Sequence, residues 1–425
     1  MIISIAGSAQ LNWQPIAGAP ANAFRHDDIF FSDVTRGWAV NADGQIWRTL
    51  DSGNSWTQLV NQPQTYFRCV GFIDSLKGFA GNLGANSWGP STDTNCLYQT
   101  LDGGISWTPV TNISGPRPLG LCGINVFDDS VINVCGRVEG PAFFMRSEDG
   151  GASWTSTDMS GYAQSLVDCY FFSRDSGFVV GGTDSVFTNS YAVVLFTSDG
   201  GNTWSSVHTS THLQTHCWKI SFPSDNVGYV SVECNTAPYV FLKTVNGGQS
   251  WQEMSYTTTA PAMVQGVGFI NDSTGWLGGF SRTYFTNDGG ATWTGSLLNQ
   301  KLNRMRFIND SMGYAVGATI YRINTSQQVG ISELQPDGFK LFDVSPNPAV
   351  NMVFIEYEIP VSAQVHIEVF DLAGRGVKVL TDKVMPPGHH KTLFGGHHSA
   401  TGIYFCTMSA GSYTETKMFV IQNEY

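Results

Sequence analysis

Short hydrophobic segments separated by polar turns repeat along most of this chain. In SEDGGASWTST, residues 147–157, a polar turn is followed at once by Trp154 and a segment that reads as a strand. Stretches of this form occur five more times, 42 to 51 residues apart. A period of this size predicts a propeller, in which each repeat forms one four-stranded sheet, or blade.

Each copy places an acidic residue or Asn five positions before a Trp, with Gly two positions after it; we call this segment the Asp turn. We expect its carboxylate to accept hydrogen bonds from the backbone N–H groups of its own turn, and the Trp to fill space between blades. Asn246 fits this structural role, since an amide oxygen accepts hydrogen bonds but cannot act as an acid. The pairs are Asp51 and Trp56, Asp102 and Trp107, Asp149 and Trp154, Asp199 and Trp204, Asn246 and Trp251, and Asp288 and Trp293.

A second hydrophobic pattern consists of Phe, a short polar turn, Gly and an aromatic or apolar residue. It occurs seven times, against six Asp turns. The last copy, at Phe307, has no Asp turn after it, whereas QLNWQPI around Trp13 resembles an outer strand with no turn before it. If the strand at Trp13 pairs with the last repeat, seven complete blades close into a ring without exposed sheet edges.

After residue 325 the repeat stops. VHIEVF, residues 365–370, alternates as a half-buried strand does, and the segment predicts a small Ig-like β-sandwich. The predicted fold is therefore all-β: a seven-bladed β-propeller over residues 10–325, a linker over 326–338 and a β-sandwich over 339–425. Residues 1–9 read as the remnant of a clipped signal peptide, or alternatively as an ordinary strand leading into the fold.

The composition of the chain excludes some classes of function. Only 13% of residues are charged, and the formal net charge of −12 argues against nucleic-acid binding. No apolar run is long enough to span a bilayer. The eight cysteines show no C-x-x-C spacing. Two pairs flank turns symmetrically, which predicts disulfides in an oxidising compartment: Cys122 with Cys135, and Cys217 with Cys234.

The segments between repeats are long and irregular on the face opposite the Asp turns. Variety on one face of a rigid scaffold favours recognition, although loops without a ligand are the alternative. The candidate binding rim consists of Tyr66, Trp88, Arg117, Tyr191, His216 and Trp218.

The Asp turns resemble the Asp-boxes of bacterial sialidase, sortilin and xyloglucan-hydrolase propellers. The fuller repeat, FFSDVTRGWAVNADGQIWRTLDSGNSWTQL, resembles the photosystem II assembly-factor type of propeller. The resemblance covers residues ~10 to 325 and implies the fold, which serves enzymes, receptors and assembly factors alike.

Two catalytic alternatives follow from that resemblance. A sialidase-like site needs three arginines that grip a carboxylate; Arg25, Arg68 and Arg304 are available, but the Arg-Ile-Pro motif is missing. A xyloglucanase-like site needs two loop carboxylates, such as Asp93 and Asp184, yet those enzymes normally pair two propellers.

The C-terminal segment resembles the type A C-terminal sorting domain of the type IX secretion system. That resemblance implies export to the medium or the outer-membrane surface of a Gram-negative bacterium, with the secretion machinery and a sortase-like protease as partners. A generic Ig-like accessory domain is the alternative. The matching landmarks are Pro346, Asn347, Pro348, Gly374, Gly402, Tyr404 and Lys417.

Four histidines of this segment, His389, His390, His397 and His398, could suggest a metal site, but no carboxylate or Cys supports them and we interpret them as loop residues. We predict no cofactor, and the sequence leaves open a calcium ion in the ring. The function we expect is a secreted, non-catalytic propeller that recognises a protein or glycan, with a secreted glycoside hydrolase as the alternative.

Overall fold

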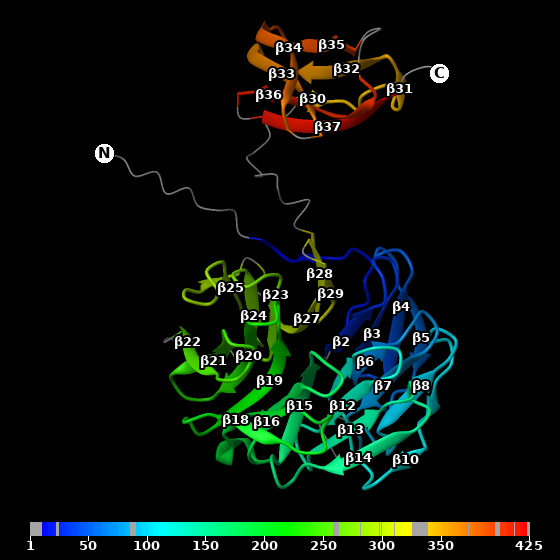
Figure 1. The fold of residues 1–425 in the computed structure, drawn as a ribbon, viewed down its shortest axis with the longest axis vertical. Helices are drawn as coiled ribbons and strands as arrows, with labels where there is room; N and C mark the ends of the chain where they lie inside the picture. Colours follow the sequence, from blue (N-terminus) through cyan, green and yellow to red (C-terminus); the bar gives the residue numbers. More distant parts are fainter. Residues whose placement is uncertain are drawn as a thin grey trace. The chain divides into compact units, whose positions relative to one another are not determined.

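The chain consists of two compact units, Met1–Gln328 and Val329–Tyr425, seen in the computed structural model in Figure 1. The boundary falls inside the predicted linker, and neither the linker nor the predicted signal remnant lies within the described residues. The structure describes residues 11–22, 25–85, 91–257, 263–280, 282–296, 298, 300–309, 311–324, 339–372, 374–395, 400–411 and 413–422.

The N-terminal unit is a β-propeller, whose described residues form seven sheets. We number these blades 1 to 7 and give the strands from the first to the last in each blade. Blade 1 has β2 (His26–Phe31), β3 (Gly37–Asn41), β4 (Gln45–Thr49) and β5 (Thr57–Asn61); blade 2 has β6 (Phe67–Phe72), β7 (Gly78–Asn82), β8 (Leu97–Thr100) and β9 (Thr108–Pro109); blade 3 has β11 (Gly123–Val126), β12 (Ile132–Gly136), β13 (Phe143–Ser147) and β14 (Trp154–Asp158), with β10 (Ile113–Ser114) added in parallel to β14.

The remaining blades follow the same order. Blade 4 has β15 (Ser165–Phe171), β16 (Gly177–Gly182), β17 (Ala192–Thr197) and β18 (Ser205–Thr209), with the 3₁₀ turn η1 (Phe187–Asn189) in a loop; blade 5 has β19 (Thr215–Ser221), β20 (Gly228–Cys234), β21 (Tyr239–Thr244) and β22 (Gln252–Thr257); blade 6 has β23 (Gly266–Phe269), β24 (Gly275–Gly278), β25 (Thr283–Thr286) and β26 (Thr294–Gly295); blade 7 has β27 (Leu302–Asn309), β28 (Met312–Gly317), β29 (Ile320–Asn324) and β1 (Gln14–Pro15). The first strands of neighbouring blades contact one another, and β27 contacts β2, so the first strands form the innermost layer of a closed ring.

The two ends of the propeller sequence share blade 7, as the hydrophobic pattern predicts. Strand β1 pairs with β29 in antiparallel register, with Gln14 opposite Arg322 and Pro15 opposite Tyr321. Trp13, just before β1, is fully buried; its ring centroid lies 5.4 Å from that of Trp276 and 5.8 Å from that of Phe307. The closure therefore combines a paired strand edge with an aromatic anchor.

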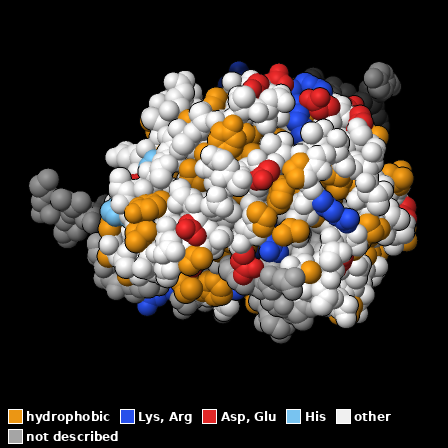
Figure 2. Space-filling model, turned by 90° about the horizontal axis from the view of Figure 1, so that it is seen from below, with side chains coloured by type: hydrophobic (Ala, Val, Ile, Leu, Met, Phe, Trp, Pro, Cys, Tyr) orange, Lys and Arg blue, Asp and Glu red, His pale blue; other side chains and the backbone are white. Residues whose placement is uncertain are grey.

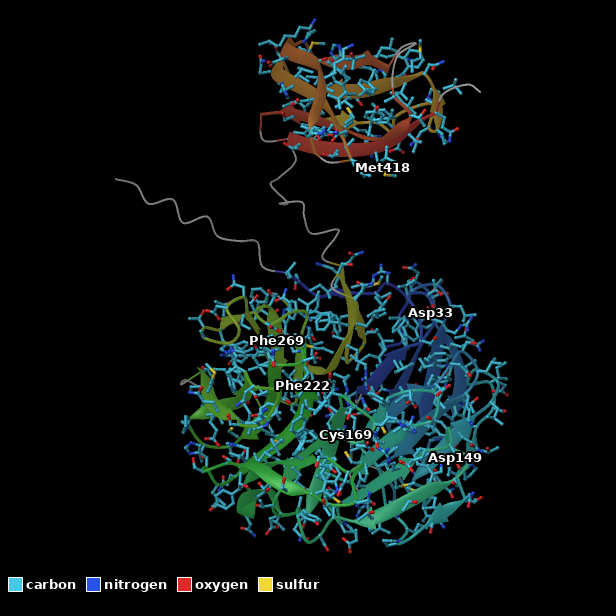
Figure 3. All side chains as sticks on the ribbon, in the orientation of Figure 1. Asp33, Asp149, Cys169, Phe222, Phe269 and Met418 are labelled. Carbon is cyan, nitrogen blue, oxygen red and sulfur yellow. The ribbon has the colours of Figure 1, made fainter. Side chains whose placement is uncertain are left out.

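The Asp turns have the geometry expected of them. In blade 3, Asp149 accepts hydrogen bonds from Ser153 through its backbone N–H at 2.9 Å and its hydroxyl at 2.6 Å. Ser147 donates to the same carboxylate at 2.8 Å, and the indole N–H of Trp154 donates to the carbonyl of Gly151 at 3.2 Å. Figure 3 shows Asp149 toward the outside of the propeller. Asn246 accepts the equivalent bond from Ser250 N–H at 3.1 Å.

The Trp of an Asp turn packs edge-on against aromatic rings at the blade interface. Trp251 of blade 5 contacts Phe178 of blade 4 at 5.9 Å and Phe222 of its own blade at 5.7 Å, with interplanar angles of 89° and 83°. Trp204 makes the corresponding contacts between blades 3 and 4. Edge-to-face contacts of this kind stabilise by about 0.5–1.5 kcal/mol beyond burial of area.

The C-terminal unit is a β-sandwich. One sheet contains β30 (Lys340–Leu341), β32 (Met352–Ile359) and β35 (Gly388–Gly395); the other contains β31 (Ala349–Val350), β37 (Tyr413–Gln422), β36 (Gly402–Ala410), β33 (Ala363–Asp371) and β34 (Gly376–Met385). Val365, Ile367 and Val369 are fully buried between the sheets, so the predicted alternation of VHIEVF is confirmed.

The structure does not contain the two disulfides that the sequence predicts, since all eight cysteines are free and buried. Cys135 lies opposite Gly123, so Cys122, one residue earlier, points to the other face of blade 3. Cys234 lies opposite Thr215, two positions away from Cys217. Symmetry about a turn does not place either pair of sulfur atoms directly across the ladder.

Replacing the buried aromatic anchor at the closure should destabilise the propeller. We expect Trp13→Ala to lower the free energy of unfolding by about 3–5 kcal/mol, because it leaves a cavity beside Trp276 and Phe307. Gln14→Ala is the matched control, since Gln14 is exposed on β1. Urea unfolding followed by tryptophan fluorescence measures both, and equal midpoints for the two variants would contradict the anchoring role.

Asp149→Ala should lower the free energy of unfolding by about 1–2 kcal/mol, because three hydrogen bonds to the carboxylate are lost. Asp149→Asn should cost less, since Asn246 shows that an amide oxygen closes the same turn. Differential scanning calorimetry can rank the variants, and an Asn variant as unstable as the Ala variant would show that the charge is needed.

Candidate functional site

The propeller has two candidate sites: a cluster of charged side chains on its axis and a groove between two blades. The axial cluster comes from the innermost strands, several of which carry a β-bulge near their start. The ladder register shifts at Asp27 in β2, at Arg68 in β6 and between Leu166 and Asp168 in β15. A bulge re-aims side chains, and these strands thereby bring charged residues to the axis.

Arginines of blade 7 hold the aspartates of blades 1 and 4. Arg304 forms a bidentate pair with Asp168, with N–O distances of 2.7 and 2.8 Å, and its Nε lies 3.1 Å from Asp28. Arg306 donates two hydrogen bonds to Asp28, at 3.1 and 3.2 Å. All four side chains except Arg306 are nearly inaccessible to solvent. The cluster therefore ties blades far apart in the sequence across the axis.

A second set of ion pairs surrounds Asp27, which is also buried. Its carboxylate accepts a hydrogen bond from Arg25 Nε at 2.6 Å and another from Arg68. Gln265 of blade 6 accepts a bond from Arg25 at 2.7 Å and donates one to Glu233 at 3.1 Å. The three arginines that a sialidase-like site would use thus lie at the axis, where each already pairs with an aspartate of this chain. Nη2 of Arg25 and Nε and Nη2 of Arg68 are buried without a hydrogen-bond partner among the described residues.

The protonation states of the axial groups follow from this pairing. Burial opposes ionisation of Asp28, but the Arg306 and Arg304 guanidinium groups outweigh it and lower the pKa to about 2. Burial also opposes ionisation of Asp168, whose pKa is lowered by the charge of Arg304. Burial lowers the pKa of Lys219 to about 8. Asp28 and Asp168 are therefore ionised at neutral pH and have no proton to donate as general acids.

Glu233 differs from these aspartates. It is 8% exposed, and burial raises the pKa of its carboxyl, with the hydrogen bond from Gln265 acting in the opposite direction. A raised carboxyl pKa is typical of the acid in a glycoside hydrolase. Sequence analysis did not select Glu233, because nothing in its local sequence distinguishes it from other strand residues.

The rim residues chosen from the sequence divide into two groups. Tyr66, His216 and Trp218 are buried, with exposed fractions of 6%, 3% and 2%. The guanidinium of Arg68 lies 5.9 Å from the Tyr66 ring and 5.4 Å from the Trp218 ring, so both aromatics belong to the axial packing. Arg117 and Tyr191 are exposed, whereas Trp88 lies outside the described residues. The structure does not bring the described rim residues together into one open surface.

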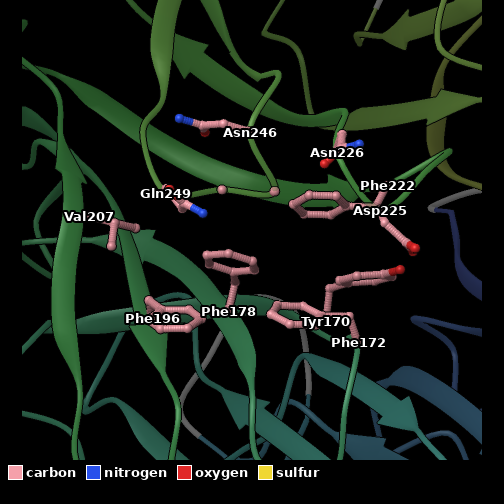
Figure 4. A pocket seen from close by; sticks show the side chains of 12 residues that line it. Tyr170, Phe172, Phe178, Phe196, Val207, Phe222, Asp225, Asn226, Asn246 and Gln249 are labelled. Carbon is pink, nitrogen blue, oxygen red and sulfur yellow. The ribbon is translucent and has the colours of Figure 1, made fainter.

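The groove lies between blades 4 and 5, on the side of the Asp turns, and encloses a cavity of about 450 Å³. We call it the aromatic groove. Figure 4 shows rings gathered along it and amide and carboxylate side chains near one wall. Its lining consists of Tyr170, Phe172, Phe178, Phe196, Val207, Phe222, Asp225, Asn226, Asn246, Gly247, Gly248 and Gln249.

The aromatic groove results from a change in how neighbouring blades are locked. At three other junctions, an aromatic and a cationic side chain of one blade bind a carbonyl of the next Asp turn. Trp38 and Arg48 donate to Gly103 O, at 2.9 and 3.1 Å; Tyr229 and Lys243 donate to Gly289 O, at 3.3 and 2.7 Å; and Tyr314 and Arg322 donate to Ser52 O, at 2.7 and 3.1 Å.

Between blades 4 and 5, the same two repeat positions hold Phe178 and Phe196. Neither phenylalanine can donate a hydrogen bond to the turn of blade 5, so the lock is replaced by ring surfaces. The repeats themselves carry a signal of this change: four blades hold Arg or Lys at the position of Phe196, whereas blades 2 and 6 hold Gln99 and Phe285.

On the face shown in Figure 2, hydrophobic side chains lie in separate small clusters, with single acidic and basic side chains between them. The described residues contain no group of three or more His, Cys, Asp or Glu that could hold a metal ion. The interpretation of the histidines as loop residues is wrong for His389 and His390, which lie in strand β35. His389 lies beside the carboxylate of Glu356, and His390 bonds the Pro386 carbonyl. His397 and His398 are outside the described residues.

The C-terminal unit matches a known protein family. Residues 343–422 match the family described as "Secretion system C-terminal sorting domain". The C-terminal unit is a sorting domain. The protein is accordingly secreted or attached to the outer-membrane surface of a Gram-negative bacterium. No helix among the described residues is long and apolar enough to cross a membrane.

Several sorting-domain landmarks hold the sandwich together. Asn347 donates to the carbonyl of Met418 at 3.2 Å and accepts from Val420 N–H at 3.0 Å, which fixes it to β37. Lys417 lies 3.0 Å from both Asp343 and Glu415. Gly374 has a φ of 74°, which suits the turn between β33 and β34.

Solved structures similar to this chain are β-propellers. YCF48 bound to D1 peptide is 17% identical, with a TM-score of 0.55 over 73% of this chain and 96% of that one. A GH74 xyloglucanase from Xanthomonas campestris is 13% identical, with a TM-score of 0.57 over 82% of this chain and 59% of that one. PorZ, a surface component of the type IX secretion system of Porphyromonas gingivalis, is also 13% identical, with a TM-score of 0.53 over 96% of this chain and 61% of that one. These likenesses show the fold alone. No curated protein matches the sequence.

The axial ion pairs predict the pH dependence of stability. The folded-state pKa of Asp28 is about 2, below its ordinary value of 3.8, and that of Asp168 is also lowered. Such groups stabilise the fold fully above pH ~4, and this stabilisation is lost as the pH falls from ~4 through ~2. We expect urea midpoints to fall steeply over that range. Asp28→Asn should flatten the profile, whereas Asn at the exposed Asp129 should leave it unchanged.

Proposed function

We propose that this protein is a cell-surface or secreted recognition module whose propeller binds its ligand in the aromatic groove without chemical conversion. The sorting domain accounts for delivery, with the type IX secretion machinery and a sortase-like protease as the partners that process it. The observation that carries the proposal is the groove itself. It is a concave site of about 450 Å³ lined by rings and a few polar groups, which is the usual composition of a ligand site.

The axial aspartates Asp28 and Asp168 have no proton to donate at neutral pH, which supports binding over catalysis. The axial aspartates are paired with arginine, and the lowered pKa values of Asp28 and Asp168 keep them ionised. The Asp turns, which we assign to the Asp-box class, are occupied by their own hydrogen bonds: Asp149 accepts from Ser147 and Ser153. Neither set offers a free acid and base on opposite sides of a substrate.

The alternative, a secreted glycoside hydrolase, has one specific observation in its favour. Glu233 is the carboxyl with a burial-raised pKa near the axis. The loop carboxylates proposed from the sequence do not support it equally, since Asp93 accepts bonds from Thr65 at 2.6 Å and Tyr98 at 2.5 Å, and Asp184 caps its own turn at Val186.

A hydrolysis assay separates the two functions. The full chain should release no product from a fluorogenic sialoside or from xyloglucan over a range of pH from 4 to 8, because no paired acid and nucleophile are available. Product measured by fluorescence and reducing-end formation, and abolished by Glu233→Gln, would overturn the proposal in favour of the hydrolase. Asp129→Asn, an exposed substitution far from any proposed site, is the control for sample quality.

A further inference from the structure

We propose that the aromatic groove binds a neutral saccharide, with a sugar ring stacked on the phenylalanine surfaces and its hydroxyl groups bonded to the polar wall. The inference rests on the proposed function and names the ligand class for the same site.

The rings of the groove form two sets, each of nearly parallel planes, and the sets are inclined to each other by 41° between Phe172 and Phe178 and by 44° between Phe178 and Phe196. Phe222 is the centre of one set: its centroid lies 4.8 Å from that of Tyr170 and 5.6 Å from that of Phe178, with interplanar angles of 17° and 12°. Phe172 and Phe196 form a second set, 6.5 Å apart and inclined by 10°. Phe178 is fully buried. Phe172 is exposed and Phe196 and Phe222 are partly buried, so these three rings supply the flat apolar surface that suits a pyranose ring.

Phe172 is the outermost part of this platform. It is 46% exposed, and it follows the repeat's own buried phenylalanine, Phe171, which is 3% exposed. In five other blades the same position holds Ser32, Ile73, Pro223, Ile270 and Ile308. Blade 3 holds Phe127, which is partly buried against a hydrophobic cluster, so an exposed aromatic residue here is particular to blade 4. The Phe172 ring packs against Phe178 and Phe196, with centroid distances of 5.9 and 6.5 Å, and its exposed side is available to a ligand.

The polar wall supplies both donors and acceptors. Asp225 and Asn226 come from the turn after β19, and Gln249 comes from the Asp turn of blade 5. Among the described residues, these three side chains form no hydrogen bond. Side-chain amides donate and accept, whereas an ionised carboxylate only accepts. Sugar hydroxyl groups also donate and accept, so each wall group has a match.

The charge of the lining excludes other ligand classes. No Lys or Arg lines the groove, and Asp225 is its one ionisable acid. A sialylated or sulfated glycan would bring an anion to this carboxylate without a counter-charge. A proline-rich peptide also fits aromatic grooves, but each proline removes one backbone N–H, so such a peptide offers the Asp225 carboxylate fewer donors than the hydroxyl groups of a saccharide do. A neutral saccharide satisfies both the rings and the carboxylate.

The test uses the full chain on a printed array of neutral oligosaccharides, sialylated oligosaccharides and proline-rich peptides. We expect binding to neutral oligosaccharides, and calorimetry with the strongest of them should show at least a tenfold rise in Kd for Phe172→Ala. Phe172→Trp should retain binding, because it keeps the flat surface. Asp225→Asn should weaken binding several-fold. Phe280→Ala is the matched control, since Phe280 is 43% exposed and outside the groove.

The other possible results of the array contradict different parts of the proposal. Binding of sialylated glycans or proline-rich peptides that Phe172→Ala abolishes would refute the neutral saccharide while leaving the groove as a recognition site. Neutral-glycan binding that is insensitive to Phe172→Ala would refute the groove. Binding to nothing on the array would refute the saccharide inference, and turnover of a bound glycan would refute the proposed function itself.

Discussion

The contact between neighbouring blades is the constraint on which the rest of the propeller depends. A blade has one apolar face toward each neighbour, and only a closed ring buries all of them and leaves no innermost strand without partners. In this chain the Trp of an Asp turn packs against rings of its own blade and of the preceding blade, as Trp251 does with Phe222 and Phe178. Two residues of β1 complete the last sheet by pairing with β29.

Because the interface is repeated, a departure at one junction has a local structural effect. Where Arg48 and Trp38 grip the next Asp turn, the two blades meet through hydrogen bonds to Gly103 O. Phe178 and Phe196 cannot form these bonds, so the turn of blade 5 stands over ring surfaces instead, and a cavity remains. The ring stays closed through the contacts of its innermost strands, so a junction without this lock can hold a groove without loss of the fold.

Sequence periodicity was sufficient for the architecture but not for the site. Asp149, Trp154 and the shared blade at Trp13 could be predicted because each repeats or completes a repeated pattern. The buried positions of Tyr66 and Trp218 could not, because β-bulges in the inner strands turn residues toward the axis and a bulge has no periodic signature. The cysteine pairs failed for the same reason of register: Cys135 is opposite Gly123, not Cys122.

The axis and the groove differ in what their polar groups do. Arg304 and Asp168 are buried together, and burial of two charges costs about as much as their attraction returns, so such a pair specifies geometry more than it adds stability. Removing either partner would leave a buried charge without compensation. This cost keeps blades 4 and 7 in the one arrangement in which Arg304 and Asp168 meet. Asp225 and Gln249 have no such partner and stay solvated until something displaces water from the rings. Polar groups that are satisfied internally hold a fold together, whereas those beside exposed aromatic surface remain free to recognise a ligand.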